Sequence, residues 1–154
     1  MIADGTLTKL LEALLSEKMQ VKKLFERVGN IEKEIAPMEI GQERKIINRK
    51  ILLYGSISGK TWLYADSIIV PDRLEKNFKE RLLSSNETIG KLLLEQKMET
   101  FREIIATGRE PAGGLSDHFQ IKNTDWLLYR TYLVFFKRKA IMMITEKFPE
   151  KYFT

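Results

Sequence analysis

The clearest pattern along the chain is two pairs of strand-like segments, each pair joined by a short polar turn. Residues 44–54 are rich in isoleucine and leucine and end at Gly55, and a second such segment, KTWLYADSIIVP, stops at Pro71. The connection SISG is short and contains glycine, which is typical of an antiparallel hairpin. Residues 126–136 and 140–147 repeat this arrangement on either side of the basic tip KRK. The pattern therefore predicts two β-hairpins.

Apolar residues at helical spacing predict helices in three of the remaining segments. Leucines recur every three or four positions near the N-terminus, which favours a helix over residues 6–28, or two helices with a break near Met19. Residues 72–85 follow a proline and are expected to form a short helix. Residues 86–108 are polar at first and apolar later, which indicates a loop through Gly90 and then one or two short helices.

Residues 30–40, NIEKEIAPMEI, alternate loosely and predict one irregular or edge strand, because Pro37 cannot take a place in a central ladder. Residues 109–120 are rich in turn-forming residues. The order of helix, strands, helices and strands predicts an α+β fold, with a single antiparallel sheet of about six strands and helices on one face. A length of 154 residues suits one core, so we expect residues 1–154 to form a single domain.

The composition is that of an ordinary folded protein, with 44% hydrophobic and 31% charged residues. The chain has no cysteine and one histidine, His118. Disulfides, thiolate zinc sites, cysteine nucleophiles and histidine-rich metal sites are therefore excluded.

The net charge of +5, from 26 basic and 21 acidic residues, is a mild excess that suits a small anionic ligand. We predict no nucleic-acid partner, because basic and aromatic residues are not interleaved as in a single-strand platform. We also predict no membrane partner, because no apolar run reaches the roughly 18 residues needed to span a bilayer. The N-terminus lacks the pattern of a secretory signal, so a cytoplasmic location is expected.

Three charged residues interrupt apolar strand patterns and are candidate functional residues. Arg49 shares a strand face with Ile51 and Leu53 by simple alternation, and Glu146 stands near the end of AIMMITEKFP. A guanidinium on an apolar face needs an anion, and a carboxylate there can accept a hydrogen bond or act as a base. Arg130, within WLLYRTYLVFF, is a second candidate anion clamp. The alternative for each residue is an ordinary solvated position with its stem on the sheet.

Four segments, in order along the chain, resemble the chorismate pyruvate-lyase family, and the small archaeal and bacterial branch is the most similar. LLEALLSEKM is similar to the first helix of that family, and INRKILLYGSISGKTWLYADSIIVP looks like its central hairpin. ETIGKLLLEQ resembles its apolar-Gly-basic segment, although Thr88 replaces the usual proline, and YRTYLVFF with AIMMITEKFP resembles its closing hairpin.

The resemblance implies both a fold and a reaction. The fold would be an antiparallel sheet with helices on one face and helical flaps that enclose a ligand pocket. The reaction would split chorismate into 4-hydroxybenzoate and pyruvate, with no metal and no organic cofactor. Chorismate and 4-hydroxybenzoate are thus the small-molecule partners that the resemblance implies.

The resemblance also implies roles for individual residues. Arg49 would bind the ring carboxylate and Glu146 would contact the ring hydroxyl, and these two are the expected catalytic residues. Arg130 would face the enolpyruvyl carboxylate, and backbone groups at Ile89 and Met19 would complete the substrate site. Gly90, which follows Ile89, is expected to aim backbone amides at the ligand.

A second interpretation is a binding module without catalysis. The same fold serves as the ligand-sensing domain of bacterial transcription regulators, so an aromatic-acid sensor or carrier is the alternative to a lyase. Retention of Arg49 together with Glu146 favours the lyase, because a sensor has no need of that pair.

Overall fold

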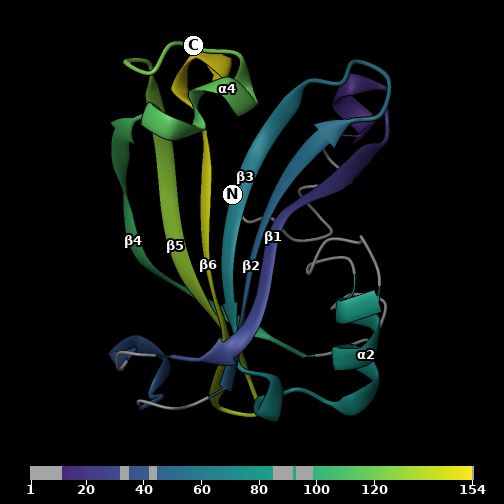
Figure 1. The fold of residues 1–154 in the computed structure, drawn as a ribbon, viewed down its shortest axis with the longest axis vertical. Helices are drawn as coiled ribbons and strands as arrows, with labels where there is room; N and C mark the ends of the chain where they lie inside the picture. The colour runs from purple at the N-terminus through teal and green to yellow at the C-terminus, as the bar shows by residue number, and fades with distance from the viewer. Residues whose placement is uncertain (1–11, 32–34, 42–44, 85–91, 93–98, 154) are drawn as a thin grey trace.

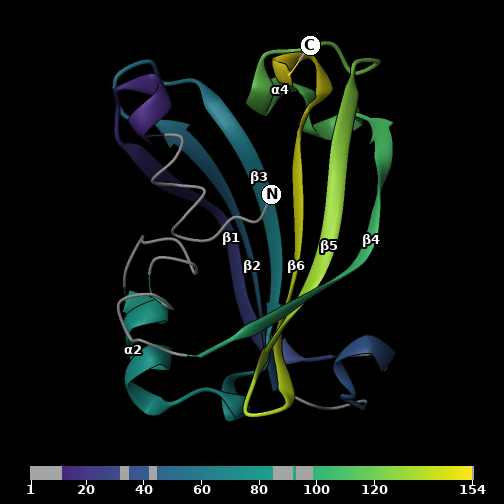
Figure 2. The same ribbon diagram turned by 180° about the vertical axis from the view of Figure 1, so that it is seen from behind.

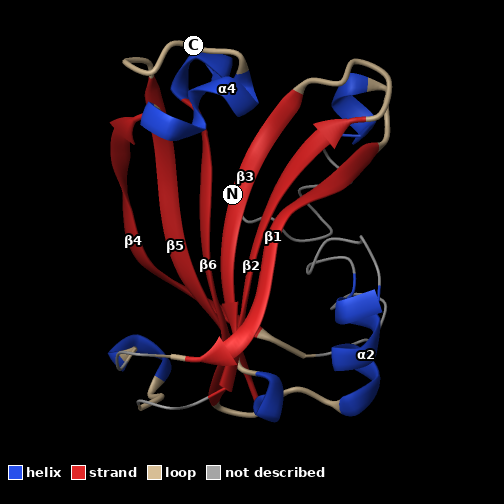
Figure 3. Ribbon diagram, viewed as in Figure 1, coloured by secondary structure: helices blue, strands red, loops and turns tan. Residues whose placement is uncertain are grey.

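The computed structural model describes residues 12–31, 35–41, 45–84, 92 and 99–153. Strands make up most of the described chain (Figure 3). The strands are β1 (Met19–Asn30), β2 (Lys45–Gly55), β3 (Thr61–Ile69), β4 (Phe101–Pro111), β5 (Trp126–Phe136) and β6 (Lys139–Pro149). The helical elements are η1 (Ala36–Met38), η2 (Pro71–Arg73), α2 (Lys76–Ser84), η3 (Gly113–Leu115), α4 (Ser116–Phe119) and η4 (Glu150–Phe153).

The six strands form one antiparallel sheet in the order β1-β2-β3-β6-β5-β4. Each half of the sheet is a run of three consecutive strands, and β3 pairs with β6 at the seam between the halves. Figure 1 and the reverse view in Figure 2 show the strands spread apart at one end and gathered at the other, with α4 and α2 at opposite ends. The prediction of a six-stranded antiparallel sheet is confirmed.

Both predicted hairpins are present. The β2–β3 pair runs from Ile47 opposite Ile69 to Tyr54 opposite Thr61, and the basic tip joins β5 to β6. Lys137 and Arg138 have φ values of 50° and 68°. Positive φ at both central residues is what a tight two-residue hairpin turn requires, because its twist then matches that of the strands. The predicted short helix after Pro71 also forms, as α2.

The helix predicted over residues 6–28 is wrong for its second half. Residues 12–15 are helical, but the chain turns before Met19 and continues as β1, whereas residues 6–11 lie outside the described part. β1 forms an edge of the sheet and pairs with β2 along its whole length. Its two lysines and one glutamate favour a helix in isolation, but the ladder with β2 satisfies its backbone and overrides that preference.

Two further expectations need correction. Residues 101–108, predicted to be helical, belong to β4, the other edge strand, which pairs with β5. The strand predicted over residues 30–40 is wrong for the described residues 35–40, where η1 stands in the middle and only an isolated bridge joins Ile35 to Ile40. Pro37 lies within η1, where its fixed φ suits the first helical turn.

The sheet buries apolar side chains on both of its faces. On one face, Phe78 and Leu82 of α2 and Leu92 pack with residues such as Ile47 and Ile144 of the strands. On the other face, two separate apolar clusters form, one with η1 and one with α4 and η4. Among the described residues, no helix is long and apolar enough to cross a bilayer. The face beneath α2 also carries the buried charged residues Arg49, Arg130 and Glu146.

Arg73 joins three elements through backbone carbonyls. Its guanidinium donates hydrogen bonds to the carbonyl oxygens of Met38 at 2.8 Å, Ala140 at 2.7 Å and Glu39 at 3.0 Å. These bonds tie η2 to η1 and to the start of β6. They stabilise the end of the sheet at which the strands gather.

We expect Arg73→Ala to lower the free energy of unfolding by about 2–4 kcal/mol, because charged donors are lost from three carbonyls. Urea unfolding followed by circular dichroism measures the change. Arg138→Ala, at the exposed hairpin tip, is the matched control and is expected to stay within about 0.5 kcal/mol of the parent protein. Equal stability of the two variants would contradict the role given to Arg73.

Candidate functional site

Three charged side chains are buried in the part of the chain that the structure describes. Their exposed fractions are 2% for Arg49, 7% for Arg130 and 0% for Glu146. These three residues are called the charged cluster below. Charged side chains are almost never fully buried without partners, because removal of their hydration is costly. The interpretation of each as an ordinary solvated residue is therefore wrong.

The charged cluster lies on one face of the sheet. Arg49 belongs to β2, Arg130 to β5 and Glu146 to β6, and the strand registers place all three on the face beneath α2. Burial on that face surrounds them with apolar side chains, which weakens solvent screening and strengthens electrostatic interactions.

Arg130 and Glu146 form a direct ion pair. They stand opposite each other in the β5–β6 ladder, and Nε of Arg130 donates a hydrogen bond of 2.7 Å to Oε1 of Glu146. Nη2 of Arg130 is buried and makes no hydrogen bond with any residue that the structure describes. The guanidinium thus stabilises the carboxylate of Glu146 and retains a donor for a further anion.

A bulge in the hairpin makes this pair possible. Phe136 pairs with Lys139 and Phe135 with Ala140, but Val134 pairs with Met142, so Ile141 is an extra residue. Without the bulge, the same turn would set Arg130 opposite Thr145 and send Glu146 to the other face, since side chains alternate along a strand. Ile141 itself is fully buried in the core, which fixes the bulge in place.

Arg49 has its own carboxylate neighbour. Glu26 of β1 stands opposite Arg49 in the ladder, and its Oε2 lies 3.7 Å from Nε of Arg49. Burial lowers the pKa of the Arg49 guanidinium, and the negative charge of Glu26 acts in the opposite direction and raises it. Arginine nevertheless stays protonated in proteins, so Arg49 is a buried positive charge. Glu26 is more exposed than Arg49, with 23% of its side chain accessible against 2%.

Small residues of β3 separate Arg49 from the ion pair. Ser67 stands opposite Arg49, and Ala65 stands opposite Glu146. Both are buried on the same face as the charged cluster. Standard sheet spacing puts the Cα atoms of Arg49 and Glu146 about 12 Å apart across β3. The side chains of β3 that lie between the two charged groups are therefore short.

Among the other predicted site residues, Met19 is described and does not lie beside the charged cluster. Met19 opens β1 opposite Gly55, which is about 20 Å along β2 from Arg49 at the usual rise per residue. The backbone N–H of Met19 donates a hydrogen bond of 2.9 Å to Oε2 of Glu12. Ile89 and Gly90 lie outside the described residues, as does the segment expected to form a flap over the ligand.

Sequence reasoning missed Glu26, Ser67 and Ala65. The helix predicted over residues 6–28 includes Glu26, so the position of Glu26 opposite Arg49 could not be predicted. The signal for Ser67 and Ala65 was present, because they are the small residues of an otherwise bulky strand segment, WLYADSII. Small side chains in a strand interior often mark a close approach by a ligand or a neighbouring chain.

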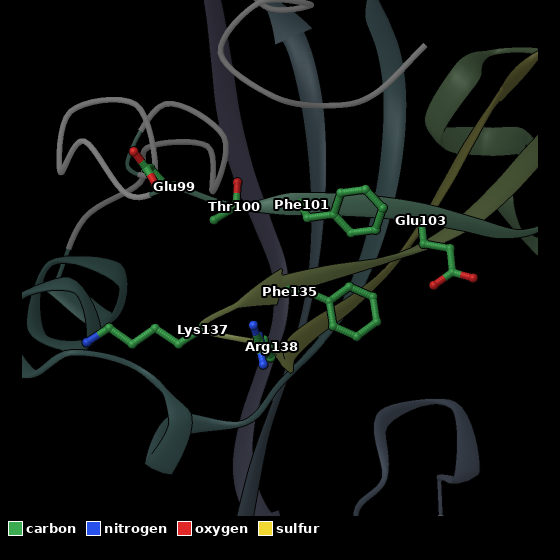
Figure 4. A pocket seen from close by; sticks show the side chains of 7 residues that line it. All are labelled: Glu99, Thr100, Phe101, Glu103, Phe135, Lys137 and Arg138. Atoms are coloured by element: carbon green, nitrogen blue, oxygen red, sulfur yellow. The ribbon is translucent and has the colours of Figure 1, made fainter.

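Two further features bear on ligand binding, namely metal ligation and the hollow at the tip of the β5–β6 hairpin. Within the described ranges, no group of three or more His, Cys, Asp or Glu residues is placed to hold a metal ion. A hollow of about 440 Å³ lies at the β5–β6 tip (Figure 4). Its lining includes Phe101 and Phe135, whose ring centroids are 6.1 Å apart, and the basic residues Lys137 and Arg138. No member of the charged cluster lines it.

Comparison with known proteins identifies relatives across the whole chain. The family model described as chorismate pyruvate-lyase Rv2949c-like matches residues 1–153. A chorismate pyruvate-lyase of Mycobacterium tuberculosis is 28% identical over 156 residues, which cover 98% of this chain and 78% of that protein. A chorismate pyruvate-lyase of Mycobacterium leprae is 29% identical over 100 residues, covering 65% of this chain and 48% of that protein.

A comparison of structures supports the fold. The C-terminal domain of a histidine utilization repressor from Pseudomonas syringae superposes with a TM-score of 0.70 at 10% sequence identity. The match covers 87% of this chain and 93% of that domain. At this identity the likeness concerns the fold alone.

We expect loss of one member of the Arg130–Glu146 pair to destabilise the protein more than loss of both. Arg130→Met removes the guanidinium that hydrogen-bonds to a buried carboxylate and should cost about 3–5 kcal/mol. The double variant Arg130→Met/Glu146→Leu removes both charges and should recover part of that loss. Urea unfolding of both single variants and the double variant measures the coupling. Single changes that add to within about 0.5 kcal/mol would contradict it.

Proposed function

Because this chain belongs to the Rv2949c-like chorismate pyruvate-lyase family, we propose that it converts chorismate to 4-hydroxybenzoate and pyruvate by eliminating the enolpyruvyl group. The observation that carries the proposal is the charged cluster: two buried guanidinium groups and one buried carboxylate on one face of the sheet. Chorismate is a dianion with a ring hydroxyl. It presents two carboxylates for the arginines and one hydroxyl for the glutamate.

In this proposal, Arg49 binds the ring carboxylate and Arg130 binds the enolpyruvyl carboxylate. Nη2 of Arg130 is the donor available for this contact, since its Nε already bonds to Glu146. Arginine binds carboxylates with charge-assisted and frequently bidentate hydrogen bonds. Fixing both ends of the substrate selects one ring conformer. Orientation of this kind accounts for much of the barrier reduction in an elimination within a single molecule.

Glu146 is proposed to accept a hydrogen bond from the ring hydroxyl and to assist loss of the proton from the carbon that bears it. As the C4–H bond breaks, its electron pair completes the aromatic ring and the C3–O bond to the enolpyruvyl group breaks. The departing enolpyruvate takes up a proton and becomes pyruvate, so the atoms balance without an oxidant. A positioned base contributes about 10²–10⁴ to such a rate. The ion pair with Arg130 orients the carboxylate for this role.

The remaining predicted contacts stay part of the proposal. The backbone of Ile89 and Gly90 is proposed to close the substrate site. We also propose that residues 1–154 act as one chorismate lyase-like domain. The charged cluster supports this, because it draws Arg49 from one half of the sheet and the ion pair from the other half.

The second candidate function is binding of an aromatic acid without catalysis. The shared fold with a repressor domain favours it. The same arginines would hold the carboxylate of such a ligand, and Glu146 would then be needed only as a hydrogen-bond acceptor. A measurement of chorismate turnover distinguishes the two functions, because only a lyase converts chorismate to products.

We expect purified protein to convert chorismate to equal amounts of 4-hydroxybenzoate and pyruvate. Ultraviolet absorbance follows the aromatic product and a lactate dehydrogenase assay follows pyruvate. Glu146→Gln keeps the shape of the side chain but removes the base, so its kcat should fall by about 10²-fold or more with little change in KM. If the parent protein gives no turnover and 4-hydroxybenzoate still raises its melting temperature, the binding function replaces the lyase.

We expect Arg49→Ala to abolish detectable binding of 4-hydroxybenzoate, because the proposed partner of the carboxylate is removed. Lys50→Ala is the matched control, since it removes the adjacent positive charge on the opposite face of β2. Isothermal titration calorimetry compares the two variants, and circular dichroism confirms that both are folded. Unchanged affinity in Arg49→Ala would remove this residue from the binding site.

A further inference from the structure

A groove lies on the face of the sheet opposite the charged cluster. Its volume is about 680 Å³, within the range of small-molecule sites. The floor includes Asn48 of β2, Asp66 of β3 and Thr145 of β6. Each of these residues directly precedes a residue that faces the other way, namely Arg49, Ser67 and Glu146. The groove and the proposed lyase site therefore occupy the two faces of the same three strands.

Opposite charges stand at two points of the groove. Arg27 projects from β1 and stands opposite Asn48 in the ladder. Asp66 accepts a hydrogen bond of 2.8 Å from Nδ2 of Asn48, which orients its carboxylate. Neither Arg27 nor Asp66 forms an ion pair with a residue that the structure describes. The groove thus offers one cation and one anion, on either side of Asn48.

The rest of the groove is largely apolar. Ile46, Ile68 and Met143 line it from the strands, and they pack against the cluster that η1 covers. Phe25 of β1 stands at the groove with 42% of its surface exposed. An apolar group that enters here would be removed from water beside these side chains.

We propose that this groove binds a zwitterionic small molecule of the amino-acid type, with an apolar side chain. Its carboxylate would pair with Arg27, its ammonium group with Asp66, and its side chain would lie on the isoleucines and Met143. A dianion such as chorismate does not fit, because Asp66 would repel it. A purely apolar ligand would leave Arg27 and Asp66 without compensation for lost hydration.

The test uses L-phenylalanine as the probe, with two analogues that each lack one charge. N-acetyl-L-phenylalanine lacks the ammonium group and phenethylamine lacks the carboxylate. Isothermal titration calorimetry is expected to show binding of L-phenylalanine and affinity lower by about tenfold or more for both analogues. Equal affinity for all three molecules, or no binding of L-phenylalanine at millimolar concentration, would overturn the proposal.

Two substitutions remove one charge each with little change of shape. Asp66→Asn and Arg27→Gln are each expected to weaken binding of L-phenylalanine by about tenfold or more. The matched controls are Asp117→Asn in α4 and Arg138→Gln at the hairpin tip, both exposed and far from the groove, and they should bind as the parent does. Loss of binding in a control as well as in its counterpart would count against the groove.

Further measurements show whether L-phenylalanine binds in the groove or at the proposed lyase site, and whether the groove is instead an interface between two copies of the chain. Arg49→Ala must still bind L-phenylalanine, and amide resonances of Asn48, Asp66 and Met143 must shift on titration. Both results hold whether or not the protein turns over chorismate. Loss of binding in Arg49→Ala would place the probe on the other face. If sedimentation shows a dimer that Asp66→Asn dissociates, and L-phenylalanine does not bind, a second copy of the chain occupies the groove instead.

Discussion

Burial of charge is the physical constraint on which this structure depends. Arg130 and Glu146 are both enclosed, and their 2.7 Å contact offsets part of the hydration that each loses. That contact exists only in one register of β5 against β6, which the bulge at Ile141 sets. A slip by one residue would turn the charges to the opposite face and expose the apolar residues beside them. The fold and the candidate site therefore rest on the same pairing of strands.

The alternation of side chains gives three strands two chemical roles. One face of β2, β3 and β6 carries Arg49, Ser67 and Glu146, and the reverse face carries the residues of the groove. The seam between β3 and β6 matters most, since it joins the two halves of the sheet that supply the charged cluster.

Local patterns predicted the parts of the fold that local interactions control. The two hairpins follow from apolar runs on either side of a short turn, and α2 follows from a proline and helical spacing. The edge strands β1 and β4 were predicted as helices, because an edge strand exposes polar side chains on much of its surface and loses the clear alternation of a half-buried strand. Its conformation depends on the backbone ladder of its neighbour, which composition does not reveal.

The sequence by itself determined which side chains carry unusual chemistry: charges within apolar strands, at Arg49, Arg130 and Glu146, stand out because burial of a charge is costly. Only the tertiary structure decided how they are partnered. The bulge that sets Arg130 opposite Glu146 is held by packing of Ile141 in the core, and Glu26 reaches Arg49 only because β1 pairs with β2. Both depend on contacts between strands, which the order of residues within one strand does not encode.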